Sequence, residues 1–115
     1  MVLLIDDKPD SKNFGVHVDK VARTFDEGIK ALQERRWDVL LLDHDLGDFD
    51  AQGKERDGHK VATWLEEHPQ FLPRRVVAVS RNPYGGDKIT AAIASARRRA
   101  EQEGIDTESE FGVGA

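Results

Sequence analysis

Short apolar runs that end in charged or polar residues alternate along this chain with segments of helical periodicity. The first runs are Val2–Ile5 and Val39–Leu42, and each is followed at once by aspartate. A continuous apolar run of this length is typical of a strand that is buried on both faces of a parallel sheet. Arg75–Val79 is a third run of this kind. The pattern therefore predicts three buried parallel strands, two of which carry acids at their carboxyl ends.

Other segments lack this pattern. Lys8–Gly15 is rich in turn-forming residues and has no helical period, so we predict a loop there. Val16–Val18, or slightly beyond, can form an edge strand because polar and charged residues are interleaved with the valines. Gly47–Gly58 is a second polar loop, and its length indicates function or mobility rather than a simple connection.

Three segments have the period of amphipathic helices. The first begins at Thr24, which forms an S/T-x-x-E capping box with Glu27. The second covers Asp57–Glu67, with Asp57 as its N-cap. The third covers about Asp87–Glu103 and follows a cluster of turn-forming residues at 82–86. The apolar positions of the third helix recur on one face: Ile89, Ala92, Ile93, Ala96 and Ala100.

The alternation of strands and helices predicts an α/β fold. Short connections indicate a mostly parallel sheet with helices on both faces and crossovers of one hand. We expect a three-layer sandwich in which a loop replaces the first helix and the strands are ordered 2-1-3-4. Residues 1–104 are predicted to form one domain, and residues 105–115 an acidic tail that is either an edge strand or disordered.

The composition narrows the function classes. A chain of 115 residues with a net charge of -5 and no cysteine has neither a disulfide framework nor a thiolate metal site. The charge also argues against general DNA binding. No apolar stretch approaches the ~20 residues of a membrane span. The start MVLLIDD does not resemble a signal peptide, so we expect a cytoplasmic protein.

The acids at the strand ends suggest a metal site. If the runs Val2–Ile5 and Val39–Leu42 are neighbouring strands, about 4.8 Å apart, then Asp6, Asp7 and Asp43 crowd one spot. Carboxylates this close repel one another unless a cation neutralises them, and an oxygen-only set suits Mg²⁺ or Mn²⁺. If the chain stays extended, Asp45 points to the side of Asp43 and His44 to the other. Asp45 is then a ligand or a base, and His44 an orienting residue or a base.

Groups that can hold phosphate follow the third apolar run. They are the Ser80 hydroxyl, Arg81 and Asn82, together with the backbone amides around Gly85, which precede the predicted helix and can form an anion nest. A divalent metal opposite phosphate-binding groups is typical of sites for phosphoryl transfer or phosphoester hydrolysis. The ligand that we expect is a small phosphorylated molecule such as a nucleotide or an RNA end.

Several motifs resemble the receiver domains of two-component response regulators. They are VLLIDD, DVLLLD, an Asp-Gly pair that opens a helix, and VVAVS. The resemblance implies a flavodoxin-like, doubly wound parallel sheet, with Asp6 and Asp7 as metal-binding acids and Asp43 as phosphoacceptor and metal ligand. It also implies that the Asp45 carbonyl binds the metal and that Ser80 contacts phosphate. Receivers, however, carry a lysine after a fifth strand, and here no lysine follows Lys88.

A divergent group, the cyclic-phosphate-processing receiver domains, is more similar to this chain. The similarity lies in the loop after the DD strand end, the DHDLG motif, the Trp64-Leu65 pair and a motif resembling H-S-x-N-P-x-G, which here reads VSRNPYG. Val79 stands where this last motif has histidine. If that histidine is a general acid, the present chain has lost it or uses His44 or His59 instead.

Two hypotheses follow. The first is a Mg²⁺- or Mn²⁺-dependent phosphoesterase-like domain that acts on a cyclic phosphate or a related nucleotide phosphoester. Its catalytic residues are Asp43, His44 and Asp45, its metal is held by Asp6, Asp7 and Asp43, and its phosphate is held by Ser80, Arg81, Asn82 and Gly85. The alternative is a non-catalytic module: a receiver-like switch with Asp43 as phosphoacceptor, or a domain that binds a phosphate ligand or a protein.

Overall fold

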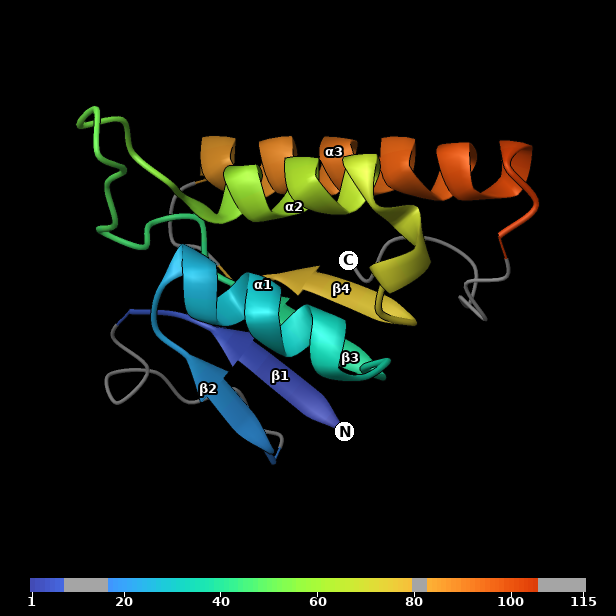
Figure 1. Cartoon of the computed structure of the whole chain (residues 1–115), viewed down its shortest axis with the longest axis horizontal. Coiled ribbons are helices and arrows are strands. Elements are labelled where there is room, and N and C mark those ends of the chain that lie inside the picture. The colour runs from blue at the N-terminus through green and yellow to red at the C-terminus, as the bar shows by residue number, and fades with distance from the viewer. Residues whose placement is uncertain (8–16, 80–82, 106–115) are drawn as a thin grey trace.

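The computed structural model describes residues 1–7, 17–79 and 83–105, and Figure 1 shows a parallel sheet with helices packed against it. The strands in the described part of the chain are β1 (Val2–Ile5), β2 (Lys20–Ala22), β3 (Val39–Leu42) and β4 (Arg75–Ala78). The helices are α1 (Phe25–Glu34), α2 (Gly58–Glu67), the short 3-10 helix η2 (Pro69–Phe71) and α3 (Pro83–Gln102). All pairs of the described strands are parallel and the order is β2-β1-β3-β4, which confirms the predicted α/β class, parallel sheet and strand order.

The register of the strands places their carboxyl ends side by side. Ile5 of β1 is opposite Leu42 of β3, and Leu42 is opposite Ala78 of β4. The ladder continues one residue further, because the Asp43 amide donates to the Ile5 carbonyl at 3.0 Å. The backbone after β1 and β3 is therefore fixed at the point where the acids begin.

The core lies between the sheet and the helices. Alternate strand residues point toward the helices and are fully buried: Leu3, Ile5, Leu40, Leu42 and Val76. They pack against the apolar face predicted for the last helix, which is likewise buried. Leu4 and Leu41 have the opposite parity and are 2 % and 6 % exposed. The leucine-rich runs are therefore buried on both faces, as predicted for central parallel strands.

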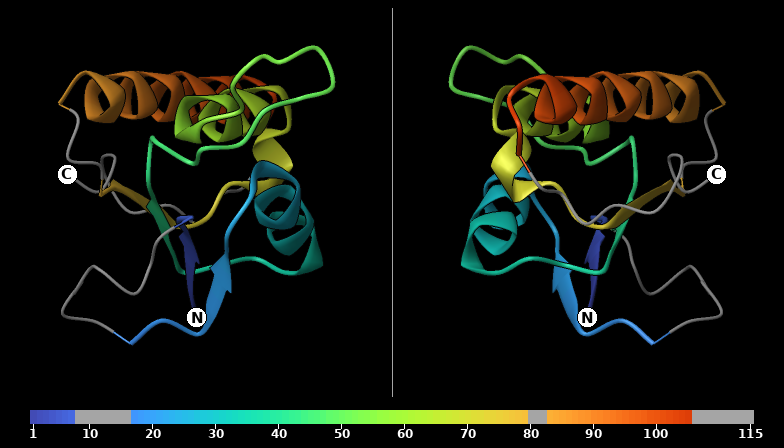
Figure 2. Two further views of the ribbon diagram at one scale, coloured as in Figure 1. Left: turned by 90° about the vertical axis from the view of Figure 1, so that its left-hand side faces the viewer. Right: turned by 90° about the vertical axis from the view of Figure 1, so that its right-hand side faces the viewer.

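The described helices all lie on one face of the sheet, as Figure 2 shows from both sides. The sequence predicted helices on both faces. The difference has a topological cause, because the crossovers β2-α1-β3 and β3-α2-β4 run in the same direction along the sheet. Parallel crossovers of one hand that run in one direction place their helices on the same face. The β1-β2 connection runs in the other direction, and the loop predicted at Lys8–Gly15 lies outside the described residues.

Two boundaries differ from the prediction. The edge strand begins at Lys20 rather than at Val16–Val18. Asp19 pairs with the start of β1, since its carboxylate accepts from the Val2 amide at 2.7 Å, and the ladder with β1 begins only after it. The last helix begins at Pro83, four positions before the predicted Asp87. A proline is well suited to a first helical position because no amide hydrogen is needed there.

The helices have no membrane-spanning character. Within the described ranges, no helix is both long enough and apolar enough to cross a bilayer. The predictions for the tail fall on residues 106–115, outside the described chain. Ile105 packs against the core just beyond the end of α3, where Gly104 has a positive φ of 70°.

Candidate functional site

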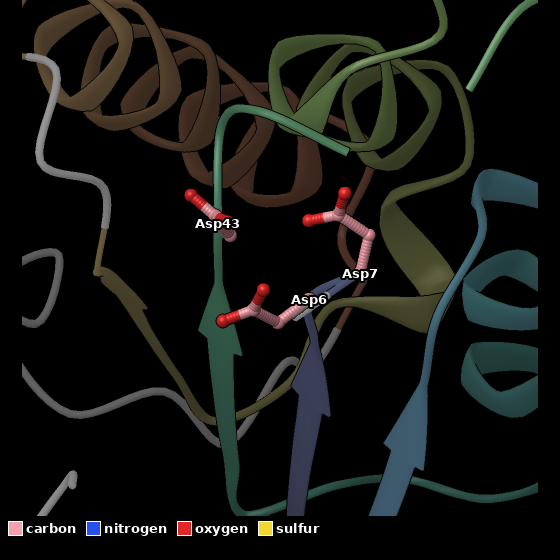
Figure 3. Close-up of side chains that lie close together, drawn as sticks. All are labelled: Asp6, Asp7 and Asp43. Carbon is pink, nitrogen blue, oxygen red and sulfur yellow. The ribbon is translucent and has the colours of Figure 1, made fainter. Parts of the chain in front are cut away.

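Three aspartates meet where β1 and β3 end. One carboxylate oxygen from each of Asp6, Asp7 and Asp43 lies within 4.8 Å of the others. Figure 3 shows these side chains on the adjoining ends of the two strands. Asp6 is fully buried and Asp43 is 4 % exposed, while Asp7 is half-buried. The strand ends thus bring together the three residues that the sequence predicted as metal ligands.

The donor set of this cluster fits a hard divalent cation. Its members are carboxylates, and burial of two of them in a small space strengthens their mutual repulsion. Mg²⁺ and Mn²⁺ prefer such oxygen ligands, and Mg²⁺ is usually bound by one or two carboxylates, several waters and substrate phosphates. Asp6, Asp7 and Asp43 are therefore the residues that would hold the ion.

The loop after β3 bends around this cluster. Gly47 has a positive φ of 59°, and a Cβ at this position would lie 3.1 Å from Oδ2 of Asp7. The Asp45 amide lies 3.4 Å from Oδ1 of Asp43 and donates to it. The Asp45 side chain is 61 % exposed and is not a member of the aspartate cluster. The chain does not stay extended beyond Asp43, so the predicted alternation of side chains does not apply here.

His44 lies between two carboxylates. Its Nδ1 is 2.9 Å from Oδ1 of Asp45, and its Nε2 is 3.3 Å from Oδ2 of Asp57. The imidazole is 13 % exposed. A neutral imidazole can donate to only one of these acceptors, whereas an imidazolium can donate to both. Both ring nitrogens are engaged with carboxylates, and this arrangement suits an orienting residue.

The start of α2 is packed directly on the backbone of the site. The Gly58 amide donates to the His44 carbonyl at 2.7 Å. A Cβ on Gly58 would lie 2.1 Å from the Asp43 carbonyl oxygen, which is far inside van der Waals contact. Asp57 is the N-cap of α2, as predicted, but its contact with His44 was missed. The sequence signal that could have indicated a role for Asp57 in the site is the Asp-Gly pair at the start of the helix.

A second group of contacts ties the loop to α1. Asp48 accepts from the Phe25 amide at 3.1 Å and from the Arg56 guanidinium at 3.1 Å. Arg56 also makes two hydrogen bonds to Asp26, of 3.0 and 2.9 Å, and lies over the Phe25 ring. Its hydrogen bonds with Asp26, and the charge of Asp48, raise the pKa of the Arg56 guanidinium above its usual value. The loop is therefore anchored at both ends, on α1 and on α2.

The neighbouring strand contributes Val79 beside Asp43. The Val79 amide donates to the Leu42 carbonyl at 3.0 Å, so this residue continues β4 alongside Asp43. The predicted phosphate-binding residues Ser80, Arg81 and Asn82 lie outside the described residues. Gly85, predicted to lie in a turn before a helix, is instead in the first turn of α3. Gly85 is helical because α3 already begins at Pro83.

A parallel α/β domain with acids at the ends of its first and third strands has the architecture of a receiver. A family model for the cyclic-phosphate processing receiver domain matches residues 1–95, and the chain belongs to this family. The match spans the aspartate cluster, the loop after β3 and the start of α3. No curated protein matches the chain.

Proposed function

We propose that this receiver domain is a divalent-metal-dependent phosphoesterase-like domain that acts on a cyclic phosphate or a related nucleotide phosphoester. The observation that carries the proposal is the cluster of Asp6, Asp7 and Asp43 at the carboxyl edge of a parallel sheet. Ligands of open α/β sheets bind at this edge. The family description, cyclic-phosphate processing, supports the substrate class.

The residues of the site have separate roles in this proposal. Asp6, Asp7 and Asp43 hold Mg²⁺ or Mn²⁺, which would neutralise phosphate charge and polarise the phosphorus–oxygen bonds. Asp45 is exposed and has its carboxylate oriented by His44, so it can accept a proton from water. The phosphate contacts are those predicted from the sequence: Ser80, Arg81, Asn82 and the Gly85 backbone.

The proposed reaction is hydrolysis of a cyclic phosphodiester. The oxygen of water forms a bond to phosphorus as one of the two ring ester bonds breaks. The proton of the water passes to the Asp45 carboxylate, and the released sugar oxygen takes a proton from solvent. The product is an open phosphomonoester.

Hydrolysis of 2′,3′-cyclic nucleotides with Mg²⁺ tests this proposal. We expect turnover by the wild-type protein and a loss of about 100-fold or more in Asp43→Asn, because removal of one charged ligand weakens both the metal and its electrostatic contribution. Asp38→Asn is the matched control, since Asp38 is an exposed aspartate at the opposite end of β3. Equal turnover by the wild type and Asp43→Asn would contradict the proposal.

A second function is favoured by one observation, the valine beside Asp43. Val79 offers no proton donor at the position where the related motif has histidine. The domain would then be a non-catalytic receiver-like switch or a module that binds a phosphate ligand or a protein, with Asp43 as phosphoacceptor.

Val79→His separates the two functions. If the valine is what prevents catalysis, the wild type will bind beryllofluoride with Mg²⁺ but will not hydrolyse cyclic nucleotides, and Val79→His will gain turnover. Val79→Leu is the control for the change in size. Hydrolysis by the wild type would contradict the hypothesis of a non-catalytic domain. A lack of any response to beryllofluoride or acetyl phosphate would contradict the hypothesis of a switch that is phosphorylated on Asp43.

A further inference from the structure

We infer that Asp57 is a positioning residue for the aspartate cluster and acts through the ring of His44. The inference rests on the proposed function, because it concerns how the same site is held ready for metal. Asp57 is outside the cluster, at the N-cap of α2, and the family match by itself assigns it no role.

The two carboxylate oxygens of Asp57 have different partners. Oδ1 accepts from the Lys60 amide at 3.0 Å, which is an ordinary N-cap contact. Oδ2 lies 3.3 Å from Nε2 of His44. A cap needs only one acceptor, so the second contact is additional to the start of α2. A serine at position 57 would keep the cap but is too short to reach the imidazole.

The contacts continue from His44 toward the cluster. The imidazole holds the Asp45 carboxylate through Nδ1 at 2.9 Å. The backbone of Asp45 in turn donates to Oδ1 of Asp43, at 3.4 Å. In this row of contacts, from Asp57 through His44 to Asp45, the first two side chains are 18 % and 13 % exposed and the last is 61 % exposed. A largely buried ring thus holds an exposed carboxylate.

The packing of α2 gives this row a rigid support. Gly58 follows Asp57 and donates its amide to the His44 carbonyl at 2.7 Å, so both the ring and the backbone of His44 are held by the same helical turn. Residues that orient the ligands of a metal without touching it commonly change metal affinity by about 10- to 100-fold when they are mutated. We expect Asp57 to act in this way.

Mn²⁺ titration followed by electron paramagnetic resonance measures the effect on affinity. Asp57→Ser and His44→Phe should each weaken Mn²⁺ binding by about tenfold. The double variant should be no weaker than either single variant, because both changes break the same row of contacts. Asp57→Ser should keep the wild-type melting temperature, whereas Asp57→Ala, which also removes the cap, should melt at a lower temperature.

A second readout is independent of metal and of turnover. The ¹⁵N resonances of the His44 ring in the metal-free protein should shift in Asp57→Ser, because Nε2 loses its carboxylate partner. Wild-type Mn²⁺ affinity in Asp57→Ser, additive losses in the double variant or unshifted ring resonances would overturn the inference. A wild-type protein that binds no Mn²⁺ would instead overturn the proposed function, so the two failures are distinguishable.

Discussion

Gly58 occupies a position where the backbones of two elements touch. Its missing side chain lets the first turn of α2 lie on the carbonyl of Asp43, and any Cβ would collide with main-chain atoms there. This contact affects both the packing of α2 and the metal site, because the backbone that Gly58 touches also carries the Asp43 side chain. Glycine is thus required at this residue by close approach rather than by an unusual φ.

Gly58→Ala should therefore destabilise the protein and weaken metal binding together. We expect a loss of about 2 kcal/mol or more in the free energy of unfolding, because overpacking against backbone cannot be relieved by a rotamer change. Chemical denaturation measures it. Gly86→Ala is the matched control, because its Cβ would be 4.0 Å from Ala78 in open helix surroundings and should leave stability equal or slightly raised. Equal stabilities of the two variants would contradict the close approach.

At the scale of the elements, the loop between β3 and α2 is held by contacts of its own side chains with α1. Arg56 supplies most of these contacts, through Asp26, Asp48 and the face of Phe25. The planar guanidinium can make a two-pronged contact with one carboxylate and still reach another. The loop that carries Gly47 and Asp48 is thereby fixed beside α1.

Arg56→Lys tests whether this geometry or the positive charge alone matters. Lysine keeps the charge but cannot make the paired contacts, so we expect a loss of about 1 kcal/mol in the free energy of unfolding. Hydrogen exchange of the Asp48–Arg56 amides should also become faster. Arg98→Lys on the exposed side of α3 should change neither quantity. Identical exchange in wild type and Arg56→Lys would show that the guanidinium does not anchor the loop.

The elements that the sequence predicted well are those with local signals. Thr24 and Asp57 cap α1 and α2 through their side chains, as the capping patterns indicated. The start of α3 was wrong because Pro83 and the glycines after it also suit a turn, and glycine has a low helix propensity. The edge strand was misplaced because its register depends on Asp19 and the start of β1, which are distant in sequence.

At the scale of the whole molecule, the parallel topology decides which acids meet. Asp6 and Asp43 are far apart in the chain, and only the β1-β3 pairing brings them together. The strand pattern made this pairing predictable. The contact between His44 and Asp57 was not, because it depends on how the helix start lies on the loop after β3.

Metal should therefore stabilise the entire domain. A ligand that binds only the folded state at about 100 times its Kd adds about 2.7 kcal/mol. For a domain of this size that corresponds to a rise of roughly 10 °C in Tm. Thermal unfolding with and without Mg²⁺ should show this rise in the wild type and in Asp38→Asn, and little of it in Asp43→Asn. A similar rise in Asp43→Asn would indicate binding elsewhere.

The central claim is that Asp6, Asp7 and Asp43 form a divalent-metal centre. The most direct test is a crystal structure of the protein soaked in Mn²⁺, with anomalous scattering used to locate the ion. We predict an anomalous peak between the three carboxylates, with oxygen atoms at about 2.0–2.2 Å, and no peak at this place in Asp43→Asn. Crystals that take up no Mn²⁺ at the cluster, or hold it only elsewhere, would contradict the claim.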